Sequence, residues 1–314
     1  MRKKIIAASI ALAVAGLSPA AAQTEWPAKP ITITIAYAPG GTIDVVARLV
    51  GEILSQKVGQ PVVIESRPGG GGAVATTALM KEDPDGYNLV ATTSTTVTLD
   101  PQVNKLAFGI ADFSYVATVG EFPEAIIGPP KSGWASLKEA LAAGKEKGNI
   151  KYGSSTPLDK LVALFIAKQS GVKIDAVPFS GGAEVVKNVM GGHVEIGYSS
   201  GAYFPHAKAG DLGVLAVLGD KRLESFPDTP TLRELGYDLS SVNHILFLAP
   251  KGVPDEVMAK MTAAFKEAGT DPKILDLMAK RSLNPVVLTG ADASDAMSRQ
   301  AEAYGALLRV TQEQ

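Results

Sequence analysis

The sequence predicts an α/β protein of two similar lobes, each a mainly parallel β-sheet flanked by helices. Three observations support this. Short apolar strands alternate with amphipathic helices, the alternation occurs in two blocks, and each block contains the same glycine-rich strand-to-helix turn. The 314 residues include no cysteine, so the hydrophobic cores must stabilise the fold without disulfides.

The first block predicts three strands and two helices. A β-branched run bounded by Pro30 and Pro39 predicts the first strand. Apolar residues then recur at the i, i+3, i+4 spacing of a helix. The turn at 83–86 has its proline and glycine where a β-turn needs them. The expected elements are strands at 31–36, 61–65 and 88–92 and helices at 43–57 and 73–81.

The second block repeats this pattern and is followed by a helical C-terminal part. Its apolar runs are again short and are separated by glycine, serine and proline. The expected strands are 150–153, 175–179, 194–198, 213–218 and 245–249, and the expected helices are 158–169, 183–190, 255–267, 271–281 and 293–310.

The shared turn predicts an anion site between the lobes. Residues 37–46 and 179–186 each contain an aromatic residue, a glycine pair, an acid and a Val-Val pair. In open α/β sheets, ligands bind beyond the carboxyl ends of the strands. Glycine lets backbone approach a ligand, and the first N–H groups of a helix have no partner within the helix. Together with the helix dipole, these groups bind an anion without a charged side chain.

Four further loops at strand ends carry glycine or small hydroxyl residues, at 69–72, 92–96, 153–156 and 199–201. Each alone is typical of an ordinary turn, but their presence in both blocks favours a polar cleft. Asp44 has two interpretations: it complements the dipole of its helix, or it holds waters or a ligand ammonium. The candidate binding residues are Tyr37, Pro39, Gly40, Gly41, Asp44, Gly71, Gly72, Thr93, Ser94, Ser154, Ser155, Thr156, Phe179, Ser180, Gly181, Gly182, Ala183, Tyr198 and Ser199.

The N-terminus predicts export. Arg2, Lys3 and Lys4 precede a 13-residue apolar run and a small-residue segment, which together predict a signal peptide cleaved after Ala22. The run is shorter than the roughly 20 residues that span a bilayer. Cleavage changes the formal net charge from −2 to −5, so no global positive charge attracts nucleic acid or an anionic membrane.

No cofactor or metal is predicted. The three histidines, at 193, 206 and 244, have no ligand spacing, and without cysteine there can be no thiolate site. The match of residues 70–75 to G-x-G-x-x-A is weak evidence for a dinucleotide site, because Arg67-Pro68 separates it from the strand.

A secreted serine hydrolase remains an alternative. Residues 197–201 match the nucleophile-elbow pattern G-x-S-x-G after a predicted strand, with Ser199 as the nucleophile. Against this, Phe204-Pro205 is expected to interrupt the helix that should follow, and no His-Gly-Gly oxyanion segment precedes it. The triad partners in the required chain order would be His244 with Asp228 or Asp238.

An ordered set of short segments from Trp26 nearly to the C-terminus carries a family resemblance. The segments are 26–31, 38–41 with Asp44 and Ala47-Arg48, 59–65 with 67–69, 84–87, 177–179 with Gly181, 191–195, 227–231 and 249–254. In these residues the chain resembles the Bug family, the TctC-like periplasmic solute-binding receptors of tripartite tricarboxylate transporters.

The resemblance implies a two-lobe periplasmic binding protein fold of type II, a Venus flytrap that closes about a hinge. The chain would cross between lobes near 121–125 and 243–245. The implied divisions are signal peptide 1–22, lobe 1 at 23–123 and 246–314, and lobe 2 at 124–245. A ligand carboxylate would be held by backbone groups and waters between loops 38–44 and 180–183, and its other end would meet loops 71–76, 93–96 and 154–156.

The expected function is therefore that of a monomeric, cofactor-free receptor, not an enzyme. It would deliver a small di- or tricarboxylate, aromatic or related acid to the membrane subunits of a transporter; a signalling role is the alternative. Lys160, where relatives commonly have histidine, is either solvated or paired with a distal acid group of the ligand. The aromatic residues that could frame an aromatic acid are Tyr37, Phe122, Phe179 and Tyr198.

Overall fold

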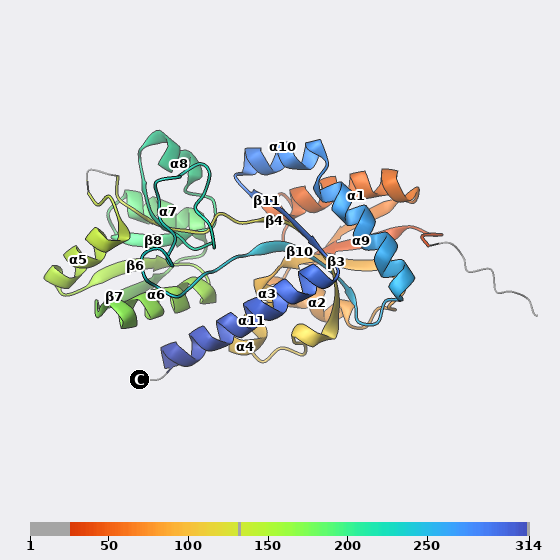
Figure 1. The fold of residues 1–314 in the computed structure, drawn as a ribbon, viewed down its shortest axis with the longest axis horizontal. Helices are drawn as coiled ribbons and strands as arrows, with labels where there is room; N and C mark the ends of the chain where they lie inside the picture. The colour runs from red at the N-terminus through yellow and green to blue at the C-terminus, as the bar shows by residue number, and fades with distance from the viewer. Residues whose placement is uncertain (1–25, 131–132, 313–314) are drawn as a thin grey trace, which may run out of the picture.

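The computed structural model describes residues 26–130 and 133–312, which form two α/β lobes side by side (Figure 1). The predicted signal peptide at 1–22 lies outside the described residues. Among the helices of the described part, none combines the length and the apolar character needed to cross a membrane.

The first lobe contains a six-stranded mixed sheet within the described chain, in the order β11-β4-β10-β3-β1-β2. β1 pairs in parallel with β2 and β3, while β10 pairs antiparallel with β3 and β4, and β11 antiparallel with β4. Strands β1 to β4 therefore run in one direction. The strands are Ile31–Ile35 (β1), Val62–Ser66 (β2), Asn88–Thr93 (β3), Phe113–Glu121 (β4), His244–Pro250 (β10) and Asn284–Thr289 (β11).

Helices cover both faces of this sheet, and alternate residues of its strands enter different cores. In β10, Ile245 and Phe247 belong to the core under α1, α9 and α10, whereas Leu246 and Leu248 belong to the core on the opposite face. Burial on both faces explains why β10 is apolar after His244. The helices are Thr42–Val58 (α1), Ala73–Leu79 (α2), Thr95–Thr98 (α3), Asp100–Val103 (α4), Asp255–Gly269 (α9), Pro272–Arg281 (α10) and Ala291–Gln312 (α11), with 3₁₀ turns at Gly70–Gly72 (η1) and Ile110–Asp112 (η2).

The second lobe contains a five-stranded sheet within the described residues, in the order β7-β6-β8-β5-β9. β6 pairs in parallel with β7 and β8, and β5 pairs antiparallel with β8 and β9. The strands are Ala125–Gly128 (β5), Ile150–Ser154 (β6), Ile174–Pro178 (β7), Ile196–Ser199 (β8) and Gly213–Val217 (β9); the helices are Leu137–Lys147 (α5), Pro157–Ser170 (α6), Gly182–Met190 (α7) and Phe204–Ala209 (α8).

The chain crosses between the sheets twice, after β4 and before β10, and the two crossing segments lie side by side (Figure 1). Phe122 N–H donates to the carbonyl of Asn243 (2.8 Å), and Leu218 N–H donates to the carbonyl of Glu124 (3.0 Å). A third connection is α11, which begins on the first lobe and packs its C-terminal half against α6. Tyr304 and Leu308 of α11 belong to a core of the second lobe.

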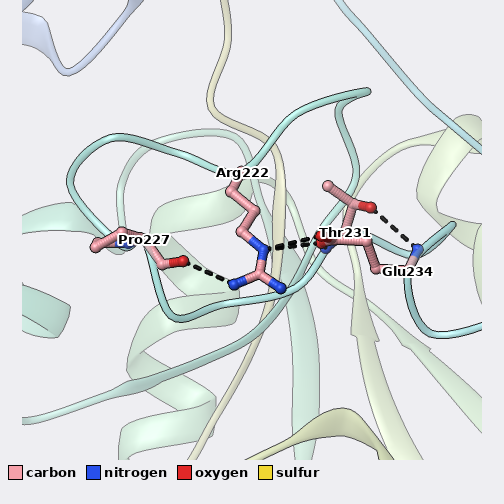
Figure 2. Close-up of polar contacts among 4 residues, drawn as sticks. All are labelled: Arg222, Pro227, Thr231 and Glu234. Atoms are coloured by element: carbon pink, nitrogen blue, oxygen red, sulfur yellow. Dashed lines mark hydrogen bonds and ion pairs between the residues drawn. The ribbon is translucent and has the colours of Figure 1, made fainter.

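An exposed polar network organises the long segment between β9 and β10 (Figure 2). Arg222 Nε lies 3.0 Å from both carboxylate oxygens of Glu234, and Arg222 Nη1 donates to the carbonyl of Pro227 (2.9 Å). Glu234 also accepts the N–H of Thr231 (2.8 Å), and Thr231 Oγ1 accepts the N–H of Glu234 (3.2 Å). These bonds fold the segment back on itself before it crosses to the first lobe.

The predicted fold class is confirmed, and every predicted strand and helix is present with ends shifted by at most two residues. The sheets are mixed rather than simply parallel, because antiparallel strands carry the crossings. The elements that were not predicted are β4, β5, β11, α3, α4, α5 and α8. The expectation that Phe204-Pro205 interrupts a helix was wrong, since Pro205 lies in the first turn of α8, where its missing N–H is not needed.

Gly197 of β8 gives a test of packing in the second lobe. A Cβ at this position would collide with Val185 Cγ1 of α7 and lie 3.2 Å from the carbonyl oxygen of Gly153. We expect Gly197→Ala to lower the free energy of unfolding by about 1–3 kcal/mol, as overpacking does. Gly181→Ala is the control, because nothing lies within 4 Å of its added Cβ. Equal melting temperatures for both variants in calorimetry would contradict this account.

Candidate functional site

The topology places the carboxyl ends of the strands of both lobes at facing edges. β4 leads out of the first sheet, and β1, β2 and β3 run in the same direction, so all four end toward the second lobe. In the second sheet Ala125, where β5 begins, pairs with Ser199 and Val217, where β8 and β9 end. β6 and β7 run parallel to β8. The loops that open α1 and α7 therefore lie at opposed edges.

One arrangement recurs at the start of α1, α6 and α7. In each helix the third residue is an acid whose carboxylate accepts the N–H of the residue before the N-cap. The three acid-to-amide distances are 2.9 Å for Asp44 and Gly40, 2.8 Å for Asp159 and Ser155, and 2.9 Å for Glu184 and Ser180. The acid holds each loop against its own helix.

The three helices differ at the N-cap. Thr156 caps α6, because its Oγ1 accepts the N–H of Asp159 (3.2 Å). The N-cap residues of α1 and α7 are Gly41 and Gly181, which have no side chain to bind the first amides. These two helix starts keep their amides and dipoles available to an anion. The loop Ser154–Thr156 instead forms a self-contained cap around Asp159, whose Oδ1 accepts Ser154 Oγ–H.

Asp44 has both carboxylate oxygens occupied. Its Oδ2 accepts the N–H of Gly40, and its Oδ1 lies 2.9 Å from Nε and Nη2 of Arg48. Asp44 is buried, and the hydrogen bond from Arg48 holds its pKa below the usual value against the opposing effect of burial. This geometry favours the interpretation in which Asp44 organises the helix start.

A hydroxyl cluster in the first lobe lies beside the start of α1. Tyr37 donates its hydroxyl to the carbonyl of Gly71 (2.9 Å), and its oxygen lies 2.9 Å from Thr93 Oγ1 and 3.3 Å from Thr96 Oγ1. Thr96 donates to the same carbonyl at 3.1 Å. The structure thus brings together the predicted residues Tyr37, Gly71 and Thr93 from three different loops.

The other predicted residues divide by burial. Pro39, Gly40, Gly41, Gly71, Thr156, Ser180 and Ala183 are exposed, and Phe179, Gly181, Gly182 and Ser155 are half-buried. Gly72 is buried beneath the hydroxyl cluster, where an added Cβ would lie 2.8 Å from Thr92 Oγ1. Lys160 is exposed.

Ser94 and Tyr198 are buried and contact the hinge instead of the facing loops. Ser94 Oγ donates to Asn243 Oδ1 (3.1 Å), and Tyr198 donates to Glu124 (2.5 Å). Ser199 is also buried, with its Oγ beside Gly182 and without a hydrogen-bond partner among the described residues.

The hydrolase triad is not assembled. His244 is buried, its Nδ1 has no hydrogen-bond partner in the described structure, and burial lowers its pKa to about 4. A triad histidine needs an acid at this nitrogen. Asp238 has a side chain 99% exposed and lies 3.8 Å from Arg233. Asp228 is likewise exposed.

A cavity of about 990 Å³ lies on the other side of the hinge. Its walls come from the segment after β9, from α10 and β11, and from α11; they include Asp220, Arg222, Asn284 and Arg299. In the first sheet, β4 and β10 separate β11 from the strands β1 to β3 that carry the predicted loops. None of the predicted ligand-binding residues lines this cavity, whereas His244 of the rejected triad does. Within the described chain, no group of three or more His, Cys, Asp or Glu residues could hold a metal ion.

The acids Asp159 and Glu184 were not among the predicted site residues. Asp159 had a recognisable signal, since Thr156-x-x-Asp159 is a capping-box pattern. Glu184 had the shared turn as its signal, because it is the acid that follows the glycine pair there, as Asp44 does in the first block, and both acids prove to be the third residue of their helix. Glu124, which joins Tyr198 at the hinge, had none: it is an acid in an otherwise apolar run.

Comparisons of sequence agree on one family. The family model described as tripartite tricarboxylate transporter family receptor matches residues 46–311. The chain is 30% identical over 288 residues to the "UPF0065 protein in gbd 5'region" of Cupriavidus necator, covering 90% of this chain and 88% of that protein. Protein BugT of Bordetella pertussis is 28% identical over 324 residues, which is 99% of this chain and 98% of BugT.

Solved structures show the same fold. A TctC solute-binding protein from Polaromonas, without ligand, superposes with a TM-score of 0.82 at 25% identity, covering 91% of this chain and 99% of that one. MatC of Rhodopseudomonas palustris with bound malate gives 0.71 at 22% identity over 90% and 100%. A further R. palustris protein with adipate gives 0.70 at 23% identity over 91% and 97%.

Asp159 gives a test of the loop-holding acids. Removing its carboxylate in Asp159→Ala leaves the N–H groups of Ser155 and Thr156 without their acceptor. We expect a loss of about 1–3 kcal/mol in the free energy of unfolding. Asp159→Asn is the matched control and is expected to lose less, because its amide oxygen still accepts both N–H groups. Denaturant unfolding measures both variants, and equal stability of Asp159→Ala and the parent would refute the role.

Proposed function

Because the chain belongs to the tripartite tricarboxylate transporter receptor family, we propose that it captures a small carboxylate between its lobes in the periplasm and delivers it to a transporter of that kind. Proteins of this family are solute-binding receptors and not enzymes, so the hydrolase alternative is withdrawn. The ligand class is supported by the malate and adipate bound to two proteins of the same fold.

The observation that carries the proposal is the opposed pair of glycine-capped helix starts, α1 and α7. Their first N–H groups, at Thr42 and Ile43 and at Gly182 and Ala183, would donate to one carboxylate. Each hydrogen bond to a charged group contributes about 1.5–3 kcal/mol. Four such bonds give roughly micromolar affinity after the costs of association. The hydroxyl cluster around Tyr37 would meet the rest of the ligand.

Closure of the two lobes would be the mechanism of capture. A ligand that bridges both lobes makes contacts in the closed state that the open state lacks, so it shifts the population toward closure. The proposed divisions remain a signal peptide at 1–22, lobe 1 at 23–123 and 246–314, and lobe 2 at 124–245. The receptor is proposed to act as a monomer and without a cofactor. Its proposed partners are the membrane subunits of the transporter.

A ligand screen tests this function directly. Mature protein is heated with malate, adipate, citrate or benzoate, with sorbitol as the uncharged control. An acid at about 100 times its dissociation constant stabilises by roughly 2.7 kcal/mol, which raises the melting temperature by a few degrees. We expect a shift with at least one acid and none with sorbitol. No shift with any acid, for protein shown to be folded, would contradict the proposal.

Thr42→Pro tests a single backbone donor. Thr42 is the first residue of α1, and Gly41 before it has the extended conformation that a following proline requires. Proline there removes only the N–H and leaves the helix intact. We expect at least a roughly 10-fold loss of affinity in calorimetry for the acid found by the screen.

Two variants serve as controls for this test. Asp255→Pro makes the same change at the start of α9, which also follows an extended residue but lies away from the facing loops. Thr42→Ala removes the side chain and keeps the N–H. Both are expected to bind as the parent does. Full affinity in Thr42→Pro would exclude this amide as a donor.

A further inference from the structure

Glu124 is a buried carboxyl group at the centre of the hinge. It lies in the first crossing segment, between β4 and β5, and only 1% of its surface is exposed. Its own backbone is part of the crossing, since its carbonyl accepts the N–H of Leu218 (3.0 Å). Burying an acid costs folding free energy unless its hydrogen bonds are satisfied. The groups that hydrogen-bond to Glu124 therefore indicate its role.

The partners come from β8 of the second lobe and from the second crossing segment. Tyr198 of β8 donates to Glu124 Oε1 (2.5 Å), Ser241 donates to Oε2 (2.8 Å), and the Asn243 side chain also donates to the carboxylate. Ser241 and Asn243 belong to the second crossing segment. Asn243 in turn accepts from Ser94 Oγ of the first lobe (3.1 Å). One carboxyl group thus joins both crossings to β8 and, through Asn243, to the first lobe.

The C-terminal helix also reaches this group. Tyr304 of α11 has its hydroxyl 3.4 Å from Ser241 Oγ and is itself buried. Because α11 packs on both lobes, any rotation about the hinge changes how the crossings and α11 surround Glu124. Ionised and neutral forms of the carboxyl have different hydrogen-bonding needs, so they favour different arrangements of these elements.

We propose that Glu124 links the two crossing segments at the hinge, and that the strength of this link depends on whether its carboxyl group is protonated. Neutral Glu124 can donate its proton to the Ser241 hydroxyl, which can turn its own hydrogen toward Tyr304, so the neutral form favours the arrangement seen here, in which the crossings enclose it. Ionised Glu124 favours a more open hinge in which water reaches the carboxylate. The proposal concerns the hinge of the free protein, and it stands whether or not the ligand is a carboxylate.

The electrostatics of the cluster support this assignment. Burial raises the pKa of Glu124 to about 7, although the hydrogen bonds from Tyr198, Ser241 and Asn243 act to lower it. Asp159 of α6 raises this pKa further as a nearby acid, and burial raises the pKa of Asp159 itself. The titratable tyrosines that face Glu124 are Tyr152 of β6, Tyr198 of β8, Tyr203 before α8 and Tyr304 of α11, and burial raises the pKa of each.

The sign of the effect follows from linkage. A glutamate in water has a pKa of about 4.3, so the enclosed state binds the proton of Glu124 more tightly than an open, hydrated state does. Acidification below about pH 7 therefore favours the enclosed state, and that advantage is lost as the pH rises through the folded pKa of Glu124. By reciprocity, closure of the hinge from any cause makes Glu124 take up a proton near neutral pH.

The test measures the separation of the lobes at different pH values without ligand. The chain has no cysteine, so Val74→Cys on α2 and Met190→Cys on α7 give two unique sites for spin labels. These residues are 48% and 44% exposed and lie on different lobes. Pulsed dipolar spectroscopy at pH 5.5, 7 and 8.5 gives their distance distribution. We expect the population at longer distance to increase several-fold from pH 5.5 to 8.5.

Glu124→Gln in the same labelled background removes the titration with little change of shape. It is expected to show one distribution at every pH, with no more of the longer distance than the parent has at pH 5.5. Glu121→Gln is the matched control: this half-buried acid lies at the same crossing, accepts from Asn284 (3.4 Å), and should leave the pH dependence intact. A pH-independent parent, or pH dependence that survives in Glu124→Gln, would overturn the proposal.

A second measurement covers the case in which Glu124→Gln does not fold. Carbon-13 NMR of the glutamate carboxyl groups in the wild-type protein follows each titration directly. Glu124 is expected to titrate near pH 7, and Glu121 is the other glutamate among the described residues whose pKa burial raises above its usual value. If every glutamate titrates below about pH 5, Glu124 is ionised in the enclosed state and the proposal fails.

Discussion

The hydrogen bond from a loop amide to an acid on the first turn of the next helix controls the geometry of this protein's facing edges. Asp44 and Glu184 each take the N–H of the residue before the N-cap, and each therefore fixes a glycine-containing loop against its helix. Because the acid binds the loop and the N-cap is glycine, the first helical amides are left for an external acceptor. At α6 the same acid position is occupied by Asp159, but Thr156 closes the cap. In this proposal, the difference between a structural cap and the proposed anion site depends on one N-cap side chain.

The sheets bring these helix starts together. Strands β1 to β4 end at the edge where the chain leaves the first lobe, and β6, β7 and β8 end where it enters the second. The antiparallel strands β5 and β10 receive the chain after each crossing. The parallel strands therefore keep their carboxyl ends, and the loops that follow them, at the facing edges. The same crossings place Glu124 and Ser241 in a single buried cluster with Tyr304 of α11. The proposed ligand site and the hinge cluster are therefore two consequences of one topology, and a change of hinge angle would alter both.

Much of this could be predicted from the sequence. The helices and strands of both blocks follow from hydrophobic periodicity, and the pairing of the 37–46 and 179–186 loops follows from their shared pattern. The strands that were missed have physical reasons. β4 is buried on both faces, so it has no alternating pattern, and β11 contains Pro285, which an edge strand tolerates. Ser94 was assigned to the site because it lies in a hydroxyl-rich loop at a strand end, and Tyr198 because its ring could frame an aromatic acid. Their side chains contact the hinge instead, because strand position alone does not determine which way a side chain turns. Glu124 could not be foreseen, because its partners Tyr198 and Ser241 are 74 and 117 positions away from it along the chain.

The most direct measurement for the central claim is a crystal structure with the acid that stabilises the protein most. This account predicts that one carboxylate lies within about 3 Å of the first amides of both α1 and α7, with the lobes closed around it. An acid bound to one lobe only, or in the cavity behind the hinge lined by Arg222 and Arg299, would contradict it.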